Sequence, residues 1–181
     1  MTGILDARNS LVRGEIIACP TEAVYGLSCD PNNLSALKKL LLLKKRQRAK
    51  GFILVASHID QLLPFLTPIS DDIMRRIMPT WPGPCTWVLP AKSSVSRYLR
   101  GDFDTLAVRI TQFPRLGALC DAFDGAIVST SANEAGEPPC TIYNEVKGIF
   151  ADKIEVIVKG EVGQLGQPTS IFDGRTGKQL R

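Results

Sequence analysis

The stretch from residue 16 to residue 27 constrains the fold of this chain most. An apolar run at residues 16–19, Ile-Ile-Ala-Cys, is typical of a buried strand. It continues into Pro-Thr-Glu-Ala-Val-Tyr-Gly-Leu, in which Pro20 fixes φ and Gly26 permits a backbone shape that other residues resist. Open α/β sheets bind ligands at strand exits of this kind. Taken alone, however, the stretch fits an ordinary strand-to-loop turn equally well.

Short apolar segments alternate with segments of helical periodicity along the rest of the chain, a pattern that predicts an α/β fold. The length suits one domain, so we expect residues 1–181 to form a single domain. The predicted strands are residues 15–19, 52–56, 87–89, 104–110, 125–128 and 154–158. The predicted helices are residues 1–13, a helix starting near residue 34, and residues 59–66, 71–78, 114–123 and 141–150, the last capped by Thr141.

The net charge of +4 fits an anionic ligand such as a nucleotide or RNA without demanding one. No apolar run approaches the ~20 residues of a membrane helix, and residues 1–13 lack the core of a signal peptide. We therefore expect a cytoplasmic protein with no membrane segment.

Cysteine and histidine usage excludes several kinds of site. The five cysteines are widely spaced and form no CxxC pair, so neither a disulfide framework nor a zinc site is favoured. We expect most of them to be buried, reduced thiols. His58 is the only histidine and lies in a predicted helix start, where a capping or surface role is favoured over catalysis.

A basic cluster follows the helix predicted near residue 34. Residues 38–50 contain seven lysines and arginines and no acidic residue. A solvated helix face whose cations complement the helix dipole accounts for one or two of them. Seven without a carboxylate neighbour favour an anion-binding role.

Two later strands end in polar groups. Arg109 alternates with apolar residues in the strand 104–110, so it needs an anionic partner, either a structural Asp or Glu or a ligand carboxylate. Residues 129–136, Ser-Thr-Ser-Ala-Asn-Glu-Ala-Gly, follow an apolar strand and favour a ligand loop, because turns of this kind can present backbone N–H groups to phosphates. The sequence contains no Walker P-loop, no GxGxxG fingerprint and no GxSxG elbow.

Six motifs appear in a specific order and cover nearly the whole chain. In that order the sequence resembles the YrdC/TsaC family of threonylcarbamoyl-AMP synthases, in its short bacterial form. The motifs are PTEAVYGL (residues 20–27), KKR with a later KG (residues 44–51), WPGPCT (residues 81–86), LAVR (residues 106–109), STSAN (residues 129–133) and PTSI (residues 168–171). The resemblance implies an open twisted mixed sheet with flanking helices around a basic concave cavity.

The resemblance also implies a reaction. ATP, L-threonine and bicarbonate would give L-threonylcarbamoyl-AMP and pyrophosphate, with Mg2+ accompanying the ATP. A downstream transferase complex would use the product to make N6-threonylcarbamoyladenosine in tRNA. Direct contact with tRNA or double-stranded RNA is left open, and so is a rival function as a non-catalytic protein that binds double-stranded RNA or ribosomal precursor RNA. No RRM, KH or dsRBD signature supports this rival.

The family motifs imply two sets of site residues. The residues implied for ATP are Lys44, Arg46, Lys50, Thr105, Ser131, Asn133 and Arg181. The residues implied for threonine are Tyr25, Arg109, Ser129 and Thr169. No catalytic side chain and no metal ligand is assigned. The chain departs from the family at Ala23, Gln47 and Thr169, where many members have threonine, proline and serine.

Overall fold

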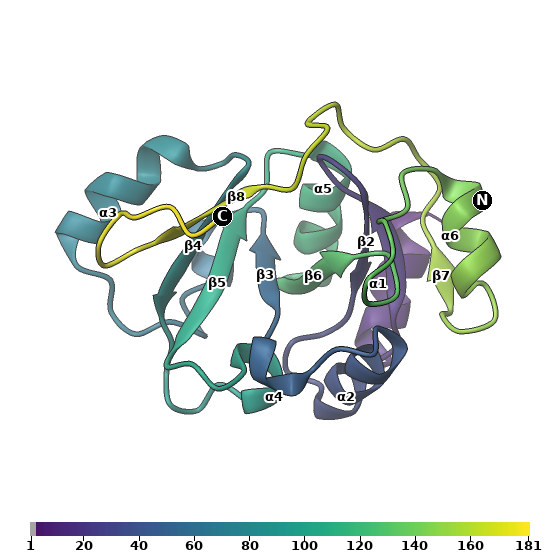
Figure 1. The fold of residues 1–181 in the computed structure, drawn as a ribbon, viewed down its shortest axis with the longest axis horizontal. Helices are drawn as coiled ribbons and strands as arrows, with labels where there is room; N and C mark the ends of the chain where they lie inside the picture. Colours follow the sequence, from purple (N-terminus) through teal and green to yellow (C-terminus); the bar gives the residue numbers. More distant parts are fainter. Residues whose placement is uncertain (1–2) are drawn as a thin grey trace.

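The computed structural model describes residues 3–181, and within them the strands form one mixed sheet (Figure 1). The strands are β1 (Ile17–Pro20), β2 (Tyr25–Ser28), β3 (Ile53–Ala56), β4 (Cys85–Pro90), β5 (Thr105–Ile110), β6 (Ile127–Ser131), β7 (Val156–Ile157) and β8 (Ser170–Asp173). Their order across the sheet is β7-β1-β2-β6-β3-β5-β4-β8. Neighbouring strands are parallel in the pairs β1/β7, β3/β5 and β4/β8 and antiparallel in the others. The predicted mixed α/β sheet is confirmed, whereas the predicted cavity stays a prediction.

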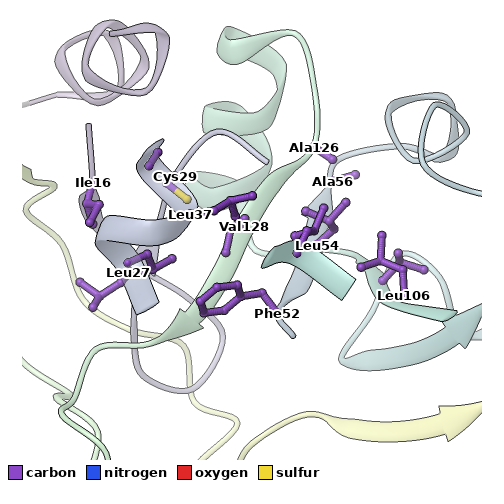
Figure 2. Close-up of a cluster of buried hydrophobic side chains, with 14 of the residues drawn as sticks. Ile16, Leu27, Cys29, Leu37, Phe52, Leu54, Ala56, Leu106, Ala126 and Val128 are labelled. Carbon is purple, nitrogen blue, oxygen red and sulfur yellow. The ribbon is translucent and has the colours of Figure 1, made fainter. Parts of the chain in front are cut away.

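Helices cover both faces of the sheet. They are α1 (Ile4–Val12), α2 (Leu34–Leu43), α3 (Asp71–Ile77), α4 (Arg97–Arg100), α5 (Pro114–Phe123) and α6 (Tyr143–Phe150). Successive strand residues point to opposite faces, so Leu54 packs in one apolar cluster and Val55 in another. α1 and α5 join the cluster of Val55, and α2 and α6 join the larger one, in which Leu37 of α2 lies among strand residues (Figure 2). No helix within residues 3–181 combines the length and apolarity needed to cross a bilayer.

Residues 17–28 form a tight hairpin, which corrects the predicted strand exit into a loop. β1 and β2 pair antiparallel with Pro20 opposite Tyr25, and the turn closes with the Thr21 N–H donating to the Val24 carbonyl at 3.0 Å. Gly26 lies in β2 and does not have a left-handed φ. Its role is spatial, because a Cβ there would lie 3.1 Å from the Thr21 methyl group.

Three element predictions were wrong in part. The helix predicted at residues 59–66 is only a 3-10 turn (Ile59–Gln61), because Pro64 lacks an N–H and disfavours helical geometry before it. Thr141 is not the cap of α6, since the Glu145 carboxylate instead accepts from the N–H groups of Thr141 and Ile142. Of the strand predicted at residues 154–158, only Val156–Ile157 (β7) forms a strand in the structure. The first two residues of the helix predicted at residues 1–13 lie outside the described residues.

Residues 159–169, here called the strap, connect the two opposite edges of the sheet, β7 and β8 (Figure 1). Midway the strap is tied to the β1–β2 turn, because the Gly163 N–H donates to the Thr21 carbonyl at 2.8 Å and the Leu165 N–H to the Glu22 carbonyl at 3.1 Å. A Cβ at Gly163 would lie 2.5 Å from the Glu22 carbonyl oxygen. Glycine therefore permits the close approach of the two chains.

Replacing Gly101 by alanine should destabilise the turn that carries Lys50. Gly101 has a φ of +72°, and a Cβ there would lie 2.2 Å from the Ala49 carbonyl oxygen. Left-handed backbone alone costs about 1–2 kcal/mol for alanine, so with the clash we expect a loss of about 2 kcal/mol or more and a melting temperature lower by at least about 4 °C. Gly148→Ala is the control, since that helical position has open space and should gain stability. Equal melting temperatures for the two variants would contradict this account.

Candidate functional site

Arg109 and Thr105 lie on one face of β5, as the alternation of the sequence predicts. Arg109 pairs in register with Val55, whose side chain belongs to the α1/α5 cluster, whereas Val108 packs in the opposite cluster. Arg109 is buried, and Thr105, four residues earlier on the same face, is half-buried. The two polar side chains of β5 therefore lie on the face of the sheet that carries the α1/α5 cluster.

Ser129 and Ser131 were predicted in a loop, but both lie in β6, where their hydroxyl groups extend this polar face. Ile53 of β3 pairs with Ser129 on one side and with Ala107 on the other, so these three residues form one row across the sheet. Ser131, two residues after Ser129, points to the same face and pairs with Gly26. The register thus brings Ser129 and Ser131 onto the face that carries Arg109.

Lys44 joins the basic segment to the loop after β6. Its side chain is buried, and Nζ donates to the Ser131 carbonyl at 2.5 Å and to the carbonyl and side-chain oxygens of Asn133 at 2.9 Å each. The Ser131 hydroxyl also donates to Asn133 Oδ1 at 2.6 Å. Burial, with a further contribution from Arg46, lowers the pKa of Lys44 to about 8. Two motifs almost ninety residues apart in sequence therefore form one unit, in which all three ammonium protons have acceptors.

Arg46 and Lys50 differ in how firmly they are held. Arg46 donates from Nε to the Gly51 carbonyl at 2.9 Å and lies over the Phe52 ring, with Cζ 5.4 Å from the ring centroid. Burial lowers its pKa. Lys50 is exposed at the end of a 3-10 turn (Arg48–Lys50), and among residues 3–181 its ammonium has no ion-pair partner. Lys50 is therefore a site cation that remains available to a ligand.

Thr169 and Arg181 meet at the end of the strap. Arg181 donates from Nη2 to the Thr169 carbonyl at 3.0 Å, and the Thr169 hydroxyl lies 3.1 Å from that of Thr86. Thr86 is fully buried in β4, and extending the β4/β5 register by one residue places it opposite Arg109. Two residues predicted from distant motifs thus meet beside β4, the strand that separates them from β5 and Arg109.

Tyr25 is fully buried, and its hydroxyl is engaged by the strap. It donates to the carbonyl oxygens of Gly160 at 2.5 Å and Val158 at 3.3 Å, and burial raises its pKa. These contacts give Tyr25 a role in fixing the strap. A direct contact with a ligand stays a prediction.

The structure supplies an internal carboxylate for Arg109, the structural alternative that the sequence left open. Arg109 Nη1 lies 3.0 Å from Glu22 Oε2, and both side chains are more than nine-tenths buried. Burial lowers the pKa of Arg109, and the Glu22 charge opposes that shift. Glu22 and its second partner, Thr111, were not predicted as site residues. Glu22 belongs to the PTEAVYGL motif, which was the only signal that could have drawn attention to it.

The remaining titratable groups are placed as expected or lie elsewhere. All five cysteines are free, and burial raises the pKa of Cys19 and Cys120 to about 12, as expected for inert thiols. His58 is exposed. In the part of the chain that the structure describes, no three His, Cys, Asp or Glu side chains gather as a metal site would require.

Comparison with known sequences shows similarity along nearly the whole chain. The Sua5/YciO/YrdC family model, described as "Telomere recombination", matches residues 9–181. A threonylcarbamoyl-AMP synthase of Aliivibrio fischeri is 46% identical over 175 residues, which make up 96% of this chain and 95% of that protein. The protein of the same name from Halorhodospira halophila is also 46% identical, over 97% of this chain and 92% of that protein.

Solved structures show the same fold. P. abyssi Sua5 complexed with L-threonine is 30% identical and superposes with a TM-score of 0.88 over 94% of this chain. This chain spans about half the length of that protein. E. coli YciO superposes with a TM-score of 0.83 over 94% of this chain and 82% of its own, at 23% identity, which shows a shared fold.

Proposed function

The chain belongs to the Sua5/YciO/YrdC family, and from that premise we propose that it is a threonylcarbamoyl-AMP synthase. It would make L-threonylcarbamoyl-AMP from L-threonine, bicarbonate and ATP and release pyrophosphate. The observation that carries this proposal is the similarity over nearly the full chain to proteins of that name. The same observation supports the synthase over the RNA-binding alternative. We place the protein in the cytoplasm, where its product would pass to a transferase that modifies tRNA.

The polar face of the sheet suits the three reactants. Lys50 and Arg46 would bind the ATP phosphates, and the loop held by Lys44, with Ser131 and Asn133, would cradle the nucleotide. These assignments are supported by the way Lys44 fixes that loop beside the basic segment. Thr105 and Arg181 complete the proposed ATP contacts. Magnesium would enter as MgATP, held by the phosphates rather than by a set of protein carboxylates.

Threonine would bind beside Arg109, with its carboxylate on the guanidinium. Ser129, Thr169 and Tyr25 are the further residues proposed for this part of the site. Support comes from the burial of Arg109 and from its Nε, a buried donor that has no hydrogen-bond partner. A desolvated guanidinium with a free donor is a strong site for a carboxylate.

The proposed reaction needs positioning and charge neutralisation more than a nucleophilic side chain. The threonine amine attacks bicarbonate and water leaves, or it attacks CO2 and loses a proton, and either route gives a carbamate. The carboxylate oxygen of that carbamate attacks the α-phosphorus of ATP. The bond from that phosphorus to the bridging oxygen then breaks, and pyrophosphate leaves. Arg46 and Lys50 would neutralise phosphate charge, and the site as a whole would hold the reactants in line, which is how most phosphoryl-transfer sites work.

The direct test is pyrophosphate release by the purified protein with ATP, bicarbonate and Mg2+, with and without L-threonine. We expect release that depends on threonine, and a threonylcarbamoyl-AMP product detected by mass spectrometry. No pyrophosphate, together with salt-sensitive binding of double-stranded RNA, would favour the RNA-binding alternative.

Lys50→Ala should weaken ATP binding without affecting stability. The exposed ammonium has no internal partner to lose, so its removal takes away only attraction to the phosphates. We expect the KM for ATP to rise about fivefold, with an unchanged melting temperature and an unchanged KM for threonine. Lys147→Ala on α6 removes another exposed lysine as the control. A lower melting temperature with unchanged ATP affinity would show that Lys50 is structural.

A further inference from the structure

The guanidinium of Arg109 is only partly satisfied inside the protein. Nη1 lies 3.0 Å from Glu22 Oε2, but the two groups are not aligned for a hydrogen bond. Arg109 Nε is buried and has no partner at all. Buried donors without partners are uncommon in folded proteins and call for an explanation. The simplest one is a ligand acceptor that arrives at the Nε edge.

Glu22 is held from the side opposite to Arg109. Its Oε1 accepts a hydrogen bond from the Thr111 hydroxyl at 2.5 Å. That hydroxyl oxygen in turn accepts from the Phe113 N–H at 3.1 Å, at the start of α5, and the Thr111 N–H donates to the Ala56 carbonyl at 2.9 Å. The carboxylate is therefore anchored to the ends of β3 and β5 and to the first turn of α5.

The backbone of Glu22 is fixed as well. Its carbonyl accepts from the Leu165 N–H of the strap, and Gly163 packs directly against it. Glu22 is 6% exposed, so its side chain cannot turn toward solvent without disturbing the strap or the hairpin. Glu22 is therefore held rigidly enough to fix the orientation of the Arg109 guanidinium.

We propose that Glu22 is a positioning residue for the amino-acid substrate. It holds Arg109 through Nη1, and Nε, which has no acceptor in the protein, would serve the substrate carboxylate. A guanidinium carries five N–H donors in a fixed plane, so one edge can serve Glu22 while another binds the ligand. Before substrate arrives, Glu22 also compensates the buried positive charge. This inference rests on the proposed function and adds to it a residue that does not touch the substrate.

The test compares L-threonine with L-threoninamide, which lacks the carboxylate, in the pyrophosphate assay. Glu22→Gln removes the charge. Thr111→Val keeps the ion pair but removes the hydroxyl that donates to Glu22 and accepts from the Phe113 N–H. For both variants we expect kcat/KM for L-threonine to fall about tenfold, mainly through KM. The kcat/KM for L-threoninamide and the KM for ATP should stay at wild-type values, because neither depends on a carboxylate bound at the Nε edge of Arg109.

Thr67→Val is the matched control, since it makes the same exchange of a hydroxyl for a methyl group, and the Thr67 hydroxyl donates to the Pro90 carbonyl rather than to Glu22. An equal loss for both substrates would overturn the inference, because a loosened fold does not distinguish a carboxylate from an amide. Wild-type values for Thr111→Val would overturn it as well, even if Glu22→Gln fails to fold. A wild-type protein that releases no pyrophosphate would instead refute the proposed function.

Discussion

Arg109→Lys should lower threonine affinity about a hundredfold and leave ATP affinity unchanged. Lysine keeps the positive charge that Glu22 requires but replaces the planar fork of donors by a single ammonium. A hydrogen bond to a charged group is worth about 1.5–3 kcal/mol, and 1.4 kcal/mol corresponds to a tenfold change in affinity. Titration calorimetry with L-threonine and, separately, with a non-hydrolysable ATP analogue measures both effects.

Lysine is a sharper probe here than alanine. Arg109→Ala should also lose threonine affinity selectively, but it leaves the Glu22 carboxylate buried without a cation, which costs about 3–5 kcal/mol of a total stability of about 5–15 kcal/mol. Arg75→Lys is the control for the exchange of arginine for lysine, because Arg75 forms an exposed ion pair with Asp72. If Arg109→Lys weakened ATP and threonine binding equally, Arg109 would be a structural residue.

Much of the sheet could be predicted because its strands follow simple periodicity. β5 is the best case, since Leu106, Val108 and Ile110 alternate with Thr105, Ala107 and Arg109, and this alternation predicted both the strand and the face of Arg109. The hairpin at residues 17–28 could not be predicted in the same way. β2 has only four residues, Tyr25–Ser28. It is a strand because it pairs with β1, and its own residues show no periodicity long enough to predict it.

The site shows the same division between local and tertiary information. The ordered motifs indicated the side chains that lie on one face, among them Arg109 and Ser129. They gave no indication that Arg109 would be paired with Glu22, because the two residues are 87 positions apart (109 − 22) and meet only through the turn between β1 and β2. For the same reason the partners of Lys44 were not foreseen. Sequence patterns identify which groups serve a site, whereas the fold decides which of them remain free for a ligand.

Lys44→Met should lower ATP affinity about a hundredfold by releasing the loop after β6. Methionine fills a similar volume but cannot donate to the Ser131 carbonyl or to the two oxygens of Asn133. An unsatisfied buried acceptor costs about 1–3 kcal/mol, so we expect the loop to move toward water rather than remain in place. Lys45→Met is the control, because this neighbouring lysine is exposed and its pair with Glu134 should contribute about 0–1 kcal/mol.

The pH dependence of ATP affinity and that of stability distinguish two roles of Lys44, its charge in ATP binding and its contribution to folding. Its pKa is lowered from 10.5 to about 8, so between these values the unfolded chain binds more protons at this side chain than the folded chain. The contribution of Lys44 to the free energy of unfolding therefore increases as pH rises through that interval. Its positive charge and one of its three hydrogen bonds are lost over the same range, so wild-type ATP affinity should fall above pH of about 8 while this contribution to stability does not. The fall should be absent from Lys44→Met, and an identical fall in that variant would assign the titration to another group.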